Sequence, residues 1–179
     1  MSTLSIRLAT AEDASAVAAI YAHYVFNGTA SFDYEPRSLS ETNEKIETAT
    51  ARNWPILVAI RDAQVVGYAH ATQFRDQPAY SFACENSVYF HPRHIRQGVG
   101  NALLAALLTH AQDAGFRQMI AVIGGGEPGS VALHTKQGFS HAGQMRSVGR
   151  KFERWLDTIY MQAPFGSGDS NAPRQEPEV

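Results

Sequence analysis

The sequence predicts one mixed α/β domain, and three observations carry this prediction. The chain has 179 residues with 44% hydrophobic content, which suffices for one sizeable core. Short apolar runs alternate with segments whose apolar residues recur at helical spacing. An apolar run that ends at Phe90 also leads through a basic, glycine-containing turn into an amphipathic segment. Such a strand, turn and helix in succession are typical of an α/β sheet.

The composition argues against several classes of protein. A net charge of -2 gives no reason to expect nucleic acid or an anionic membrane as a partner. No apolar run is long enough to span a membrane, and the N-terminus lacks a basic-then-apolar signal segment. Cys84 is the only cysteine, so no intrachain disulfide can form. These features predict a cytoplasmic protein.

The first half of the chain predicts three strands and two helices. Thr10 caps the start of the first helix, and Ser38 and Glu41 form a capping box at the start of the second. Two β-branched runs separated by a polar turn predict a hairpin. The expected elements are strand 4–8, helix 10–27, helix 38–52, and strands 56–60 and 65–71.

The second half predicts three more strands and two helices. Gly115 and Gly138 stand where helices are expected to end, and Ser130 is expected to cap the shorter helix. The expected elements are strand 80–90, a helix from the glycine turn to about 114, strand 119–123, helix 130–138 and strand 155–161. Residues 164–179 are rich in Gly, Ser, Pro, Asn and Glu, which predicts a disordered tail after a domain at 1–163.

The turn at Arg96–Asn101 is the strongest candidate for a ligand site. The first amides of a helix lack internal partners and lie at the positive end of its dipole, and glycines let a ligand approach them. These features predict an anion site, most plausibly for phosphates. No Lys-Ser/Thr pair follows Gly98 and Gly100, and Leu103 stands in place of a third dinucleotide-fold glycine. A tight turn without a ligand is the alternative.

The segment Arg96-Gln97-Gly98-Val99-Gly100 after a strand resembles the pyrophosphate motif of the GNAT superfamily of N-acetyltransferases, which bind acetyl-CoA. Glu85-Asn86-Ser87-Val88-Tyr89 and His91-Pro92-Arg93-His94 resemble the branch of phosphinothricin and methionine sulfoximine acetyltransferases. The resemblance covers about residues 4–162. It implies a GNAT-type, mostly antiparallel sheet, splayed at the acetyl-CoA strand, with helices on both faces. Ile95 departs from the usual Gln or Arg, which removes one side-chain contact.

Two residues are candidates for catalysis. Acetyl transfer needs a neutral amine, so a nearby carboxylate base helps. The resemblance assigns that role to Glu85, which could otherwise be a surface carboxylate. His134 stands where many relatives carry a proton-donating Tyr, and it is an acid, part of a proton path, or a packing residue.

The resemblance also implies the residues that bind acetyl-CoA. The strand is expected to hold the thioester oxygen with its backbone, and the turn is expected to hold the phosphates. Glu127 replaces a common CoA-contacting Asn and cannot donate a hydrogen bond when ionised. The expected set is Val88, Tyr89, Phe90, Arg96, Gln97, Gly98, Val99, Gly100, Asn101, Glu127 and Lys136.

The substrate implied by the resemblance is an amino acid. Arg75 can clamp one carboxylate, whereas Gln77 stands where phosphinothricin enzymes carry a second Arg. This favours methionine sulfoximine or sulfone over phosphinothricin. The expected substrate-binding residues are Phe32, Arg75, Gln77, Tyr80, Asn86 and Ser87, and packing on the core is the alternative for Phe32.

Other readings stay open at this point. The chain could acetylate another amine, such as a polyamine, an aminoglycoside or a peptide N-terminus, or it could be a non-catalytic acyl-CoA binding module. His91 and His94 lack a second pair at ligand spacing, so no metal is expected. The resemblance implies a homodimer.

Overall fold

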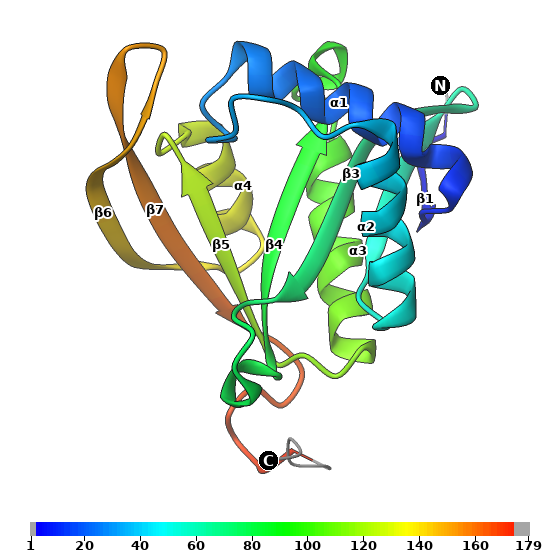
Figure 1. The fold of residues 1–179 in the computed structure, drawn as a ribbon. Helices are drawn as coiled ribbons and strands as arrows, with labels where there is room; N and C mark the ends of the chain where they lie inside the picture. Colours follow the sequence, from blue (N-terminus) through cyan, green and yellow to red (C-terminus); the bar gives the residue numbers. More distant parts are fainter. Residues whose placement is uncertain (1–2, 174–179) are drawn as a thin grey trace.

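The computed structural model describes residues 3–173, which fold around a seven-stranded sheet (Figure 1). The strand order is β1-β2-β3-β4-β5-β7-β6. Among these residues, β4 and β5 form the one parallel pair, and the other neighbours are antiparallel. The strands are β1 Ser5–Leu8, β2 Ile56–Arg61, β3 Gln64–Gln73, β4 Ala83–Phe90, β5 Gln118–Gly124, β6 Ser140–Lys151 and β7 Arg154–Pro164. The predicted mixed, mostly antiparallel sheet is confirmed.

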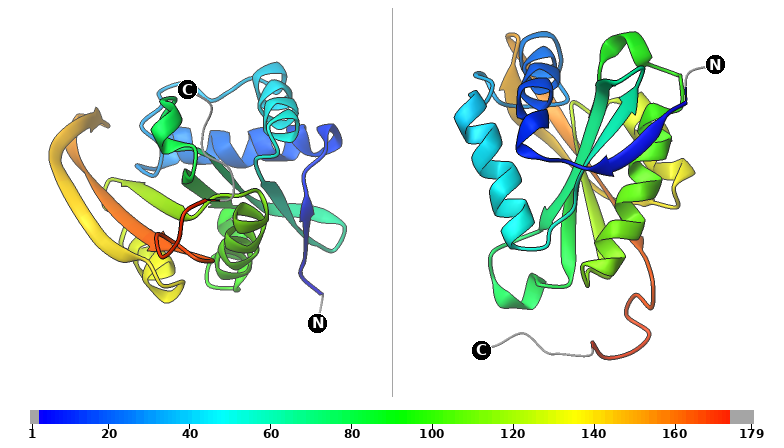
Figure 2. Two further views of the ribbon diagram at one scale, coloured as in Figure 1. Left: turned by 90° about the horizontal axis from the view of Figure 1, so that it is seen from below. Right: turned by 90° about the vertical axis from the view of Figure 1, so that its right-hand side faces the viewer.

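Helices cover both faces of the sheet, as predicted. α1 (Ala14–Asn27) and α2 (Leu39–Ala51) lie on one face, and α3 (Val99–Asp113) and α4 (Pro128–Lys136) lie on the other (Figure 2). Each face has its own apolar core. Buried residues of α1 and α2 pack on Val58 and Tyr68, whereas those of α3 pack on Leu57 and Met119. The alternating strand residues of β2 and β3 thereby supply both cores.

The two central strands separate along their length. β4 pairs with β5 from Ala83 opposite Gln118 to Asn86 opposite Ala121. Beyond that point β4 continues to Phe90 and β5 to Gly124 without further pairing, and Figure 1 shows the two ends diverging. The predicted splay at this strand is therefore confirmed, and it leaves a gap in the middle of the sheet.

Three local predictions differ from the structure. β4 begins at Ala83 and not near 80, because Pro78–Tyr80 form a 3₁₀ turn in which the Tyr80 amide donates to the Gln77 carbonyl (2.9 Å). α4 begins at Pro128 with Glu127 at its N-cap, so Ser130 is not the cap; proline is pre-organised for the first helical position. β6 was not expected from its own pattern, because most of its residues are exposed and it forms by pairing with β7.

The end of the described chain lies against the start of β5. The Phe165 amide donates to the carbonyl of Arg117, whose guanidinium donates to carbonyls of Gly168, Asn171 and Ala172. Part of the predicted tail thus has defined contacts. Residues 174–179 lie outside the described residues, so the boundary at 163 stays a prediction.

Candidate active site

The glycine turn before α3 is shaped as a cradle for an anion. Gly98 is the N-cap with a positive φ of 82°, a conformation that glycine adopts without strain. The first helical backbone bond runs from the Ala102 amide to the Gly98 carbonyl (3.0 Å), so the amides of Val99, Gly100 and Asn101 have no acceptor in the helix. A Cβ on Gly100 would lie 2.9 Å from Phe90 Cε1, so glycine lets α3 start close to β4.

Side chains of the turn fix its backbone in place. Gln97 Oε1 accepts from the Arg61 guanidinium (2.6 Å), and Gln97 Nε2 donates to the Arg93 carbonyl (2.8 Å). Asn101 Oδ1 accepts from Gln137 Nε2 (2.8 Å), which links α3 to the end of α4. Gln97 and Asn101, which were expected to bind acetyl-CoA, therefore hold the turn in place with their side chains. The backbone amides of the turn remain available to phosphates. Arg96 and Lys136 are exposed.

A cavity leads from this turn into the gap in the sheet. It measures about 320 Å³ and is lined by α1, the end of β4 and the start of α4. Val88, Tyr89 and Phe90 line it, as predicted for the acetyl-CoA strand, and Ile95 contributes an apolar side chain. A smaller cavity of about 60 Å³ continues between β4 and β5 and shares Val88 and Tyr89. The two form one path from the turn to the middle of the sheet.

The wall of this path is held by Glu127. Its carboxylate accepts a hydrogen bond from the Thr29 hydroxyl, in the loop that follows α1. Gly125 is equally close to this loop, since a Cβ there would collide with the Thr29 side chain. Glu127 lines both cavities, and its described partner is a hydroxyl of the protein. The structure thus gives Glu127 a role in closing the loop over the gap.

Neighbouring residues of β4 face opposite sides of the sheet. Cys84, Val88 and Phe90 contact the core under α3, so the even-numbered residues point to that side. Tyr89 packs on the core under α1 and α2, so Glu85 and Ser87 point to the other side. The sequence grouped Asn86 with Ser87 as substrate residues, whereas the structure separates the two side chains.

Asn86 contacts the second predicted catalytic residue. His134 is buried on α4, and its Nε2 lies 3.1 Å from Asn86 Oδ1 while its Nδ1 lies 2.8 Å from the Ser130 carbonyl. Burial lowers the pKa of His134, which favours the neutral ring. A neutral ring that donates from Nδ1 to the Ser130 carbonyl has an acceptor at Nε2, and this tautomer requires the Asn86 amide to be turned from the placement above so that its nitrogen faces Nε2. The other amide atom of Asn86 is then buried without a partner.

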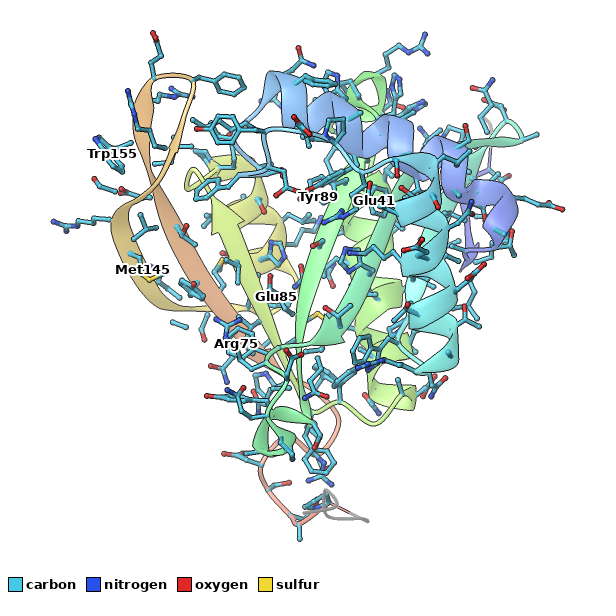
Figure 3. The ribbon with its side chains drawn as sticks, viewed as in Figure 1. Glu41, Arg75, Glu85, Tyr89, Met145 and Trp155 are labelled. Carbon is cyan, nitrogen blue, oxygen red and sulfur yellow. The ribbon has the colours of Figure 1, made fainter. Side chains whose placement is uncertain are left out.

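Glu85 lies half-buried on the opposite side of β4. Burial raises the pKa of Glu85, and the positive charges of Arg75 and Lys45 lower it in part. Figure 3 shows Glu85 on β4 and Arg75 below it, in the loop that follows β3. Arg75 is exposed, stacks on the Phe74 ring at 4.1 Å, and donates to the Phe74 carbonyl. Arg75 is therefore near enough to Glu85 for its charge to lower the pKa of the carboxyl, and the roles of the two residues stay predictions.

The remaining predicted substrate residues lie at two ends of the gap. Tyr80 packs edge-on against Phe74 (5.7 Å between centroids), and Gln77 is exposed beside it, so both belong to the Arg75 loop. Phe32 lies at the opposite end, against Gly124 of β5 and Gly149 of β6, where a Cβ would collide with its ring. Phe32 thus packs the loop after α1 onto the β6–β7 hairpin.

Sequence reasoning missed three polar residues on the side of the sheet where Glu85 lies. Lys45 comes from α2, His70 from β3 and Arg37 from the loop before α2. Burial lowers the pKa of Lys45 to about 8 and holds the pKa of His70 well below its usual range. The sequence did hold one signal for Lys45. It lies three residues after Thr42 and four before Ala49, so the three share one helix face, and Thr42 and Ala49 are buried in the structure.

Neither metal ligands nor a membrane span accompany this site. Within residues 3–173, no group of three or more His, Cys, Asp or Glu side chains could hold a metal ion. In the same part of the chain, no helix has the length and apolar character that crossing a membrane requires.

Comparison with known proteins identifies this arrangement. The family model of the acetyltransferase (GNAT) domain matches residues 6–160, and the chain belongs to this family. It is 42% identical over 170 residues to phosphinothricin N-acetyltransferase of Alcaligenes faecalis, covering 94% of this chain and 86% of that protein. It is 38% identical to the L-methionine sulfoximine/L-methionine sulfone acetyltransferase of Pseudomonas aeruginosa, covering 88% and 92%.

A solved structure agrees with this assignment. The GNAT superfamily phosphinothricin acetyltransferase of Sinorhizobium meliloti, in complex with AcCoA, superimposes with a TM-score of 0.94 at 41% identity. The match covers 97% of this chain and 94% of that one. The resemblance predicted from the motifs is confirmed, and the chain is an acetyltransferase of the GNAT family.

Proposed function

We propose that this enzyme transfers the acetyl group of acetyl-CoA to the α-amino group of a small amino acid of the methionine sulfoximine, methionine sulfone or phosphinothricin type. The observation that carries the proposal is the position of Arg75 below Glu85 at the lower end of the gap (Figure 3), where its charge is near enough to lower the pKa of the carboxyl. Arg75 is a partner for an α-carboxylate, and Glu85 is a base for the adjacent amine. The names of the relatives support the same class of substrate.

The residues along the path fit acetyl-CoA. The unpaired amides at Val99, Gly100 and Asn101 suit a pyrophosphate, and the close approach that Gly100 permits keeps them beside the cavity. The cavity of about 320 Å³ is largely apolar near Ile95 and Leu133, which suits the pantetheine arm. When bound, acetyl-CoA supplies an acyl thioester, whose carbonyl carbon is the electrophile.

The backbone of β4 can hold the thioester oxygen. The His91 amide donates to the Val66 carbonyl (2.8 Å) and the Phe74 amide donates to the Ala83 carbonyl (2.9 Å), so odd-numbered residues of β4 bond to β3. The even-numbered residues therefore face β5, where pairing stops at Asn86. The Phe90 carbonyl accepts from the Tyr24 hydroxyl (2.6 Å), and we assign the Val88 amide to the oxygen.

Glu85 acts as the general base in this proposal. An α-amino group is mostly protonated at neutral pH, and an ionised Glu85 attracts the ammonium form and accepts its proton, directly or through water. Burial raises the pKa of Glu85, which makes the carboxylate a stronger base than one in water. The neutral amine then attacks the thioester carbon directly, without an acyl-enzyme; the C–S bond breaks as the amide forms, and the departing CoA thiolate takes up, through water, the proton that the nitrogen loses. Cys84 is buried, and burial raises the pKa of its thiol to about 12, so it takes no part.

His134 contributes through position. Its neutral ring, bonded to Asn86 and Ser130, forms one wall of the gap between β4 and β5. With Nδ1 as the donor to the Ser130 carbonyl, Nε2 has no proton to give to a departing thiolate. We therefore assign His134 to fixing Asn86 and the shape of the gap. A homodimer in the cytoplasm stays a prediction from the resemblance and the composition.

A panel assay of CoA release tests the proposal. Methionine sulfone, methionine sulfoximine and phosphinothricin are compared with spermidine, an aminoglycoside and a peptide N-terminus. We expect the amino acids to give a kcat/KM at least tenfold above the other amines. Equal or higher activity on an amine without an α-carboxylate would contradict the proposed pairing with Arg75, and no CoA release from any member would contradict the assigned transfer.

A further inference from the structure

Lys45 is directed toward the sheet. On α2 the buried residues are Thr42, Ile46 and Ala49, and Lys45 lies three residues after Thr42 on the inner part of the helix. The ion pairs among residues 3–173 join Arg7 to Asp13 and Arg37 to Asp33, so the Lys45 ammonium has no carboxylate within ion-pair distance. Lys45 is only partly exposed, and holding an ammonium partly out of water without a counterion is costly.

A cavity beside Lys45 reaches toward the catalytic carboxylate. It measures about 350 Å³ and is lined by Lys45, Arg37, Thr48 and Thr72, among others. Thr72 on β3 is the cross-strand neighbour of Glu85 on β4. Because directly opposed residues of antiparallel strands point to the same face, this cavity and Glu85 share one side of the sheet.

The acidic residues of this cavity do not neutralise Lys45. Glu41 is exposed and is engaged by the amide and hydroxyl of Ser38 in the capping box (both 2.7 Å), and Figure 3 shows it on α2. Glu44 is exposed and accepts from the Ser40 hydroxyl (3.4 Å). The positive charge of Lys45 therefore remains available to a ligand.

The electrostatics around Lys45 favour an anion. Burial, and then the nearby Arg37, lower the pKa of Lys45 to about 8, while Glu85 and Asp33 raise it. At neutral pH most Lys45 side chains therefore carry the ammonium form, although burial and the charge of Arg37 both disfavour that form. His70 lies on the same face, and burial, Lys45 and Arg37 keep its ring neutral, with Nδ1 buried and without a partner. A bound anion would relieve the repulsion between Lys45 and Arg37.

We propose that Lys45 is a specificity-determining residue that binds an anionic group at the end of the substrate side chain, while Arg75 binds the α-carboxylate. This inference rests on the proposed amino-acid acetylation. Lys45 and Arg75 come from different elements, and both are close enough to Glu85 to lower its pKa. An α-amino group held at Glu85 thus has one cation for its carboxylate and another for an acidic side chain. The neutral Gln77, which stands where phosphinothricin enzymes carry a second Arg, is then not required to bind the anionic group of the side chain.

Two amino acids of similar shape, one with an anionic and one with a neutral end, test whether Lys45 binds the anionic group. Phosphinothricin ends in a phosphinate anion, and methionine sulfone ends in a neutral sulfone. Lys45→Met keeps an unbranched side chain and removes the charge. We expect Lys45→Met to lower kcat/KM at neutral pH at least tenfold for phosphinothricin and less than threefold for methionine sulfone. Lys45→Arg keeps the positive charge and should retain most of the phosphinothricin activity. Arg146→Met, which removes a charge from an exposed position of β6, is the control and should change neither.

The outcomes separate this inference from the proposed function. If the wild type acetylates both amino acids and Lys45→Met leaves the ratio of the two kcat/KM values unchanged, the inference fails and the proposed function stands. An equal loss on both substrates would show a structural role for Lys45 and also overturn the inference. If the wild type acetylates methionine sulfone alone, no anion subsite exists, and if it acetylates neither, the proposed function and the inference fail together.

Discussion

The two faces of β4 differ in how their polar groups are satisfied. On the face toward α4, both ring nitrogens of His134 have partners, in Asn86 and Ser130. On the face toward α2, the side chains of Glu85, Lys45 and His70 make no hydrogen bond to any described residue, although all three are largely or partly buried. Buried polar groups are normally paired; the first face leaves one amide atom of Asn86 without a partner, but the unpaired ionisable groups lie on the second face, where we expect a ligand to bind. We therefore expect the chemistry to take place at Glu85 and His134 to have a structural role.

The largest expected effect follows from removing the base. Glu85→Gln keeps the shape of the side chain but cannot accept a proton, and it should lower kcat by about 10²–10⁴-fold, the usual range for a positioned base. The affinity for acetyl-CoA should barely change, because the turn at Gly98 lies at the other end of β4. Steady-state kinetics and isothermal calorimetry measure the two quantities.

The matched variant on the opposite face is His134→Gln, which retains polar atoms near Asn86 and Ser130. We expect kcat to fall less than tenfold, mainly through the loosened wall of the gap. A loss in His134→Gln as large as that in Glu85→Gln would contradict the distinction between the two faces.

A smaller effect is expected at the rim of the Glu85 face. Arg75→Ala removes a charge-assisted hydrogen bond worth about 1.5–3 kcal/mol, so KM for amino-acid substrates should rise tenfold or more. Because Arg75 also lowers the pKa of Glu85, its loss should raise that pKa further. Unchanged amino-acid kinetics in this variant would place the α-carboxylate elsewhere.

The smallest expected effect concerns the glycine turn before α3, which we propose binds the phosphates and which lies on neither face of β4. A methyl group on Gly100 would meet the Phe90 ring at 2.9 Å, and relieving such overpacking costs about 1–3 kcal/mol. Gly100→Ala should therefore move the start of α3 and raise KM for acetyl-CoA by about fivefold, with kcat nearly unchanged. Gly143→Ala is the control, because nothing lies within 4 Å of its Cβ and Gly143 is distant from the turn. An unaltered KM in Gly100→Ala would argue against this turn as the phosphate site.

The fold could be predicted further than the site. The glycine turn and the amphipathic helices follow from local spacing, whereas the splayed strand and the roles expected of Glu85 and Arg75 came from the family resemblance of the motifs around β4. Lys45 could not be placed, because its approach to Glu85 depends on the packing of α2 over β3, which no local pattern specifies. Asn86 was grouped with the substrate residues although strand alternation already implied that it and Ser87 face opposite sides. The strand β6 escaped prediction because its largely exposed residues show no alternation.

The pH dependence of kcat/KM for methionine sulfone in wild type, Glu85→Gln and His134→Gln tests the central claim most directly. An ionised Glu85 lets the enzyme use the ammonium form, so kcat/KM of the wild type should rise through the elevated pKa of Glu85 and then level off above it. His134→Gln should keep that plateau. Glu85→Gln should lack it and rise about tenfold per pH unit toward the pKa of the free amine, because only neutral amine can then react. A plateau that persists in Glu85→Gln and disappears in His134→Gln would contradict the account.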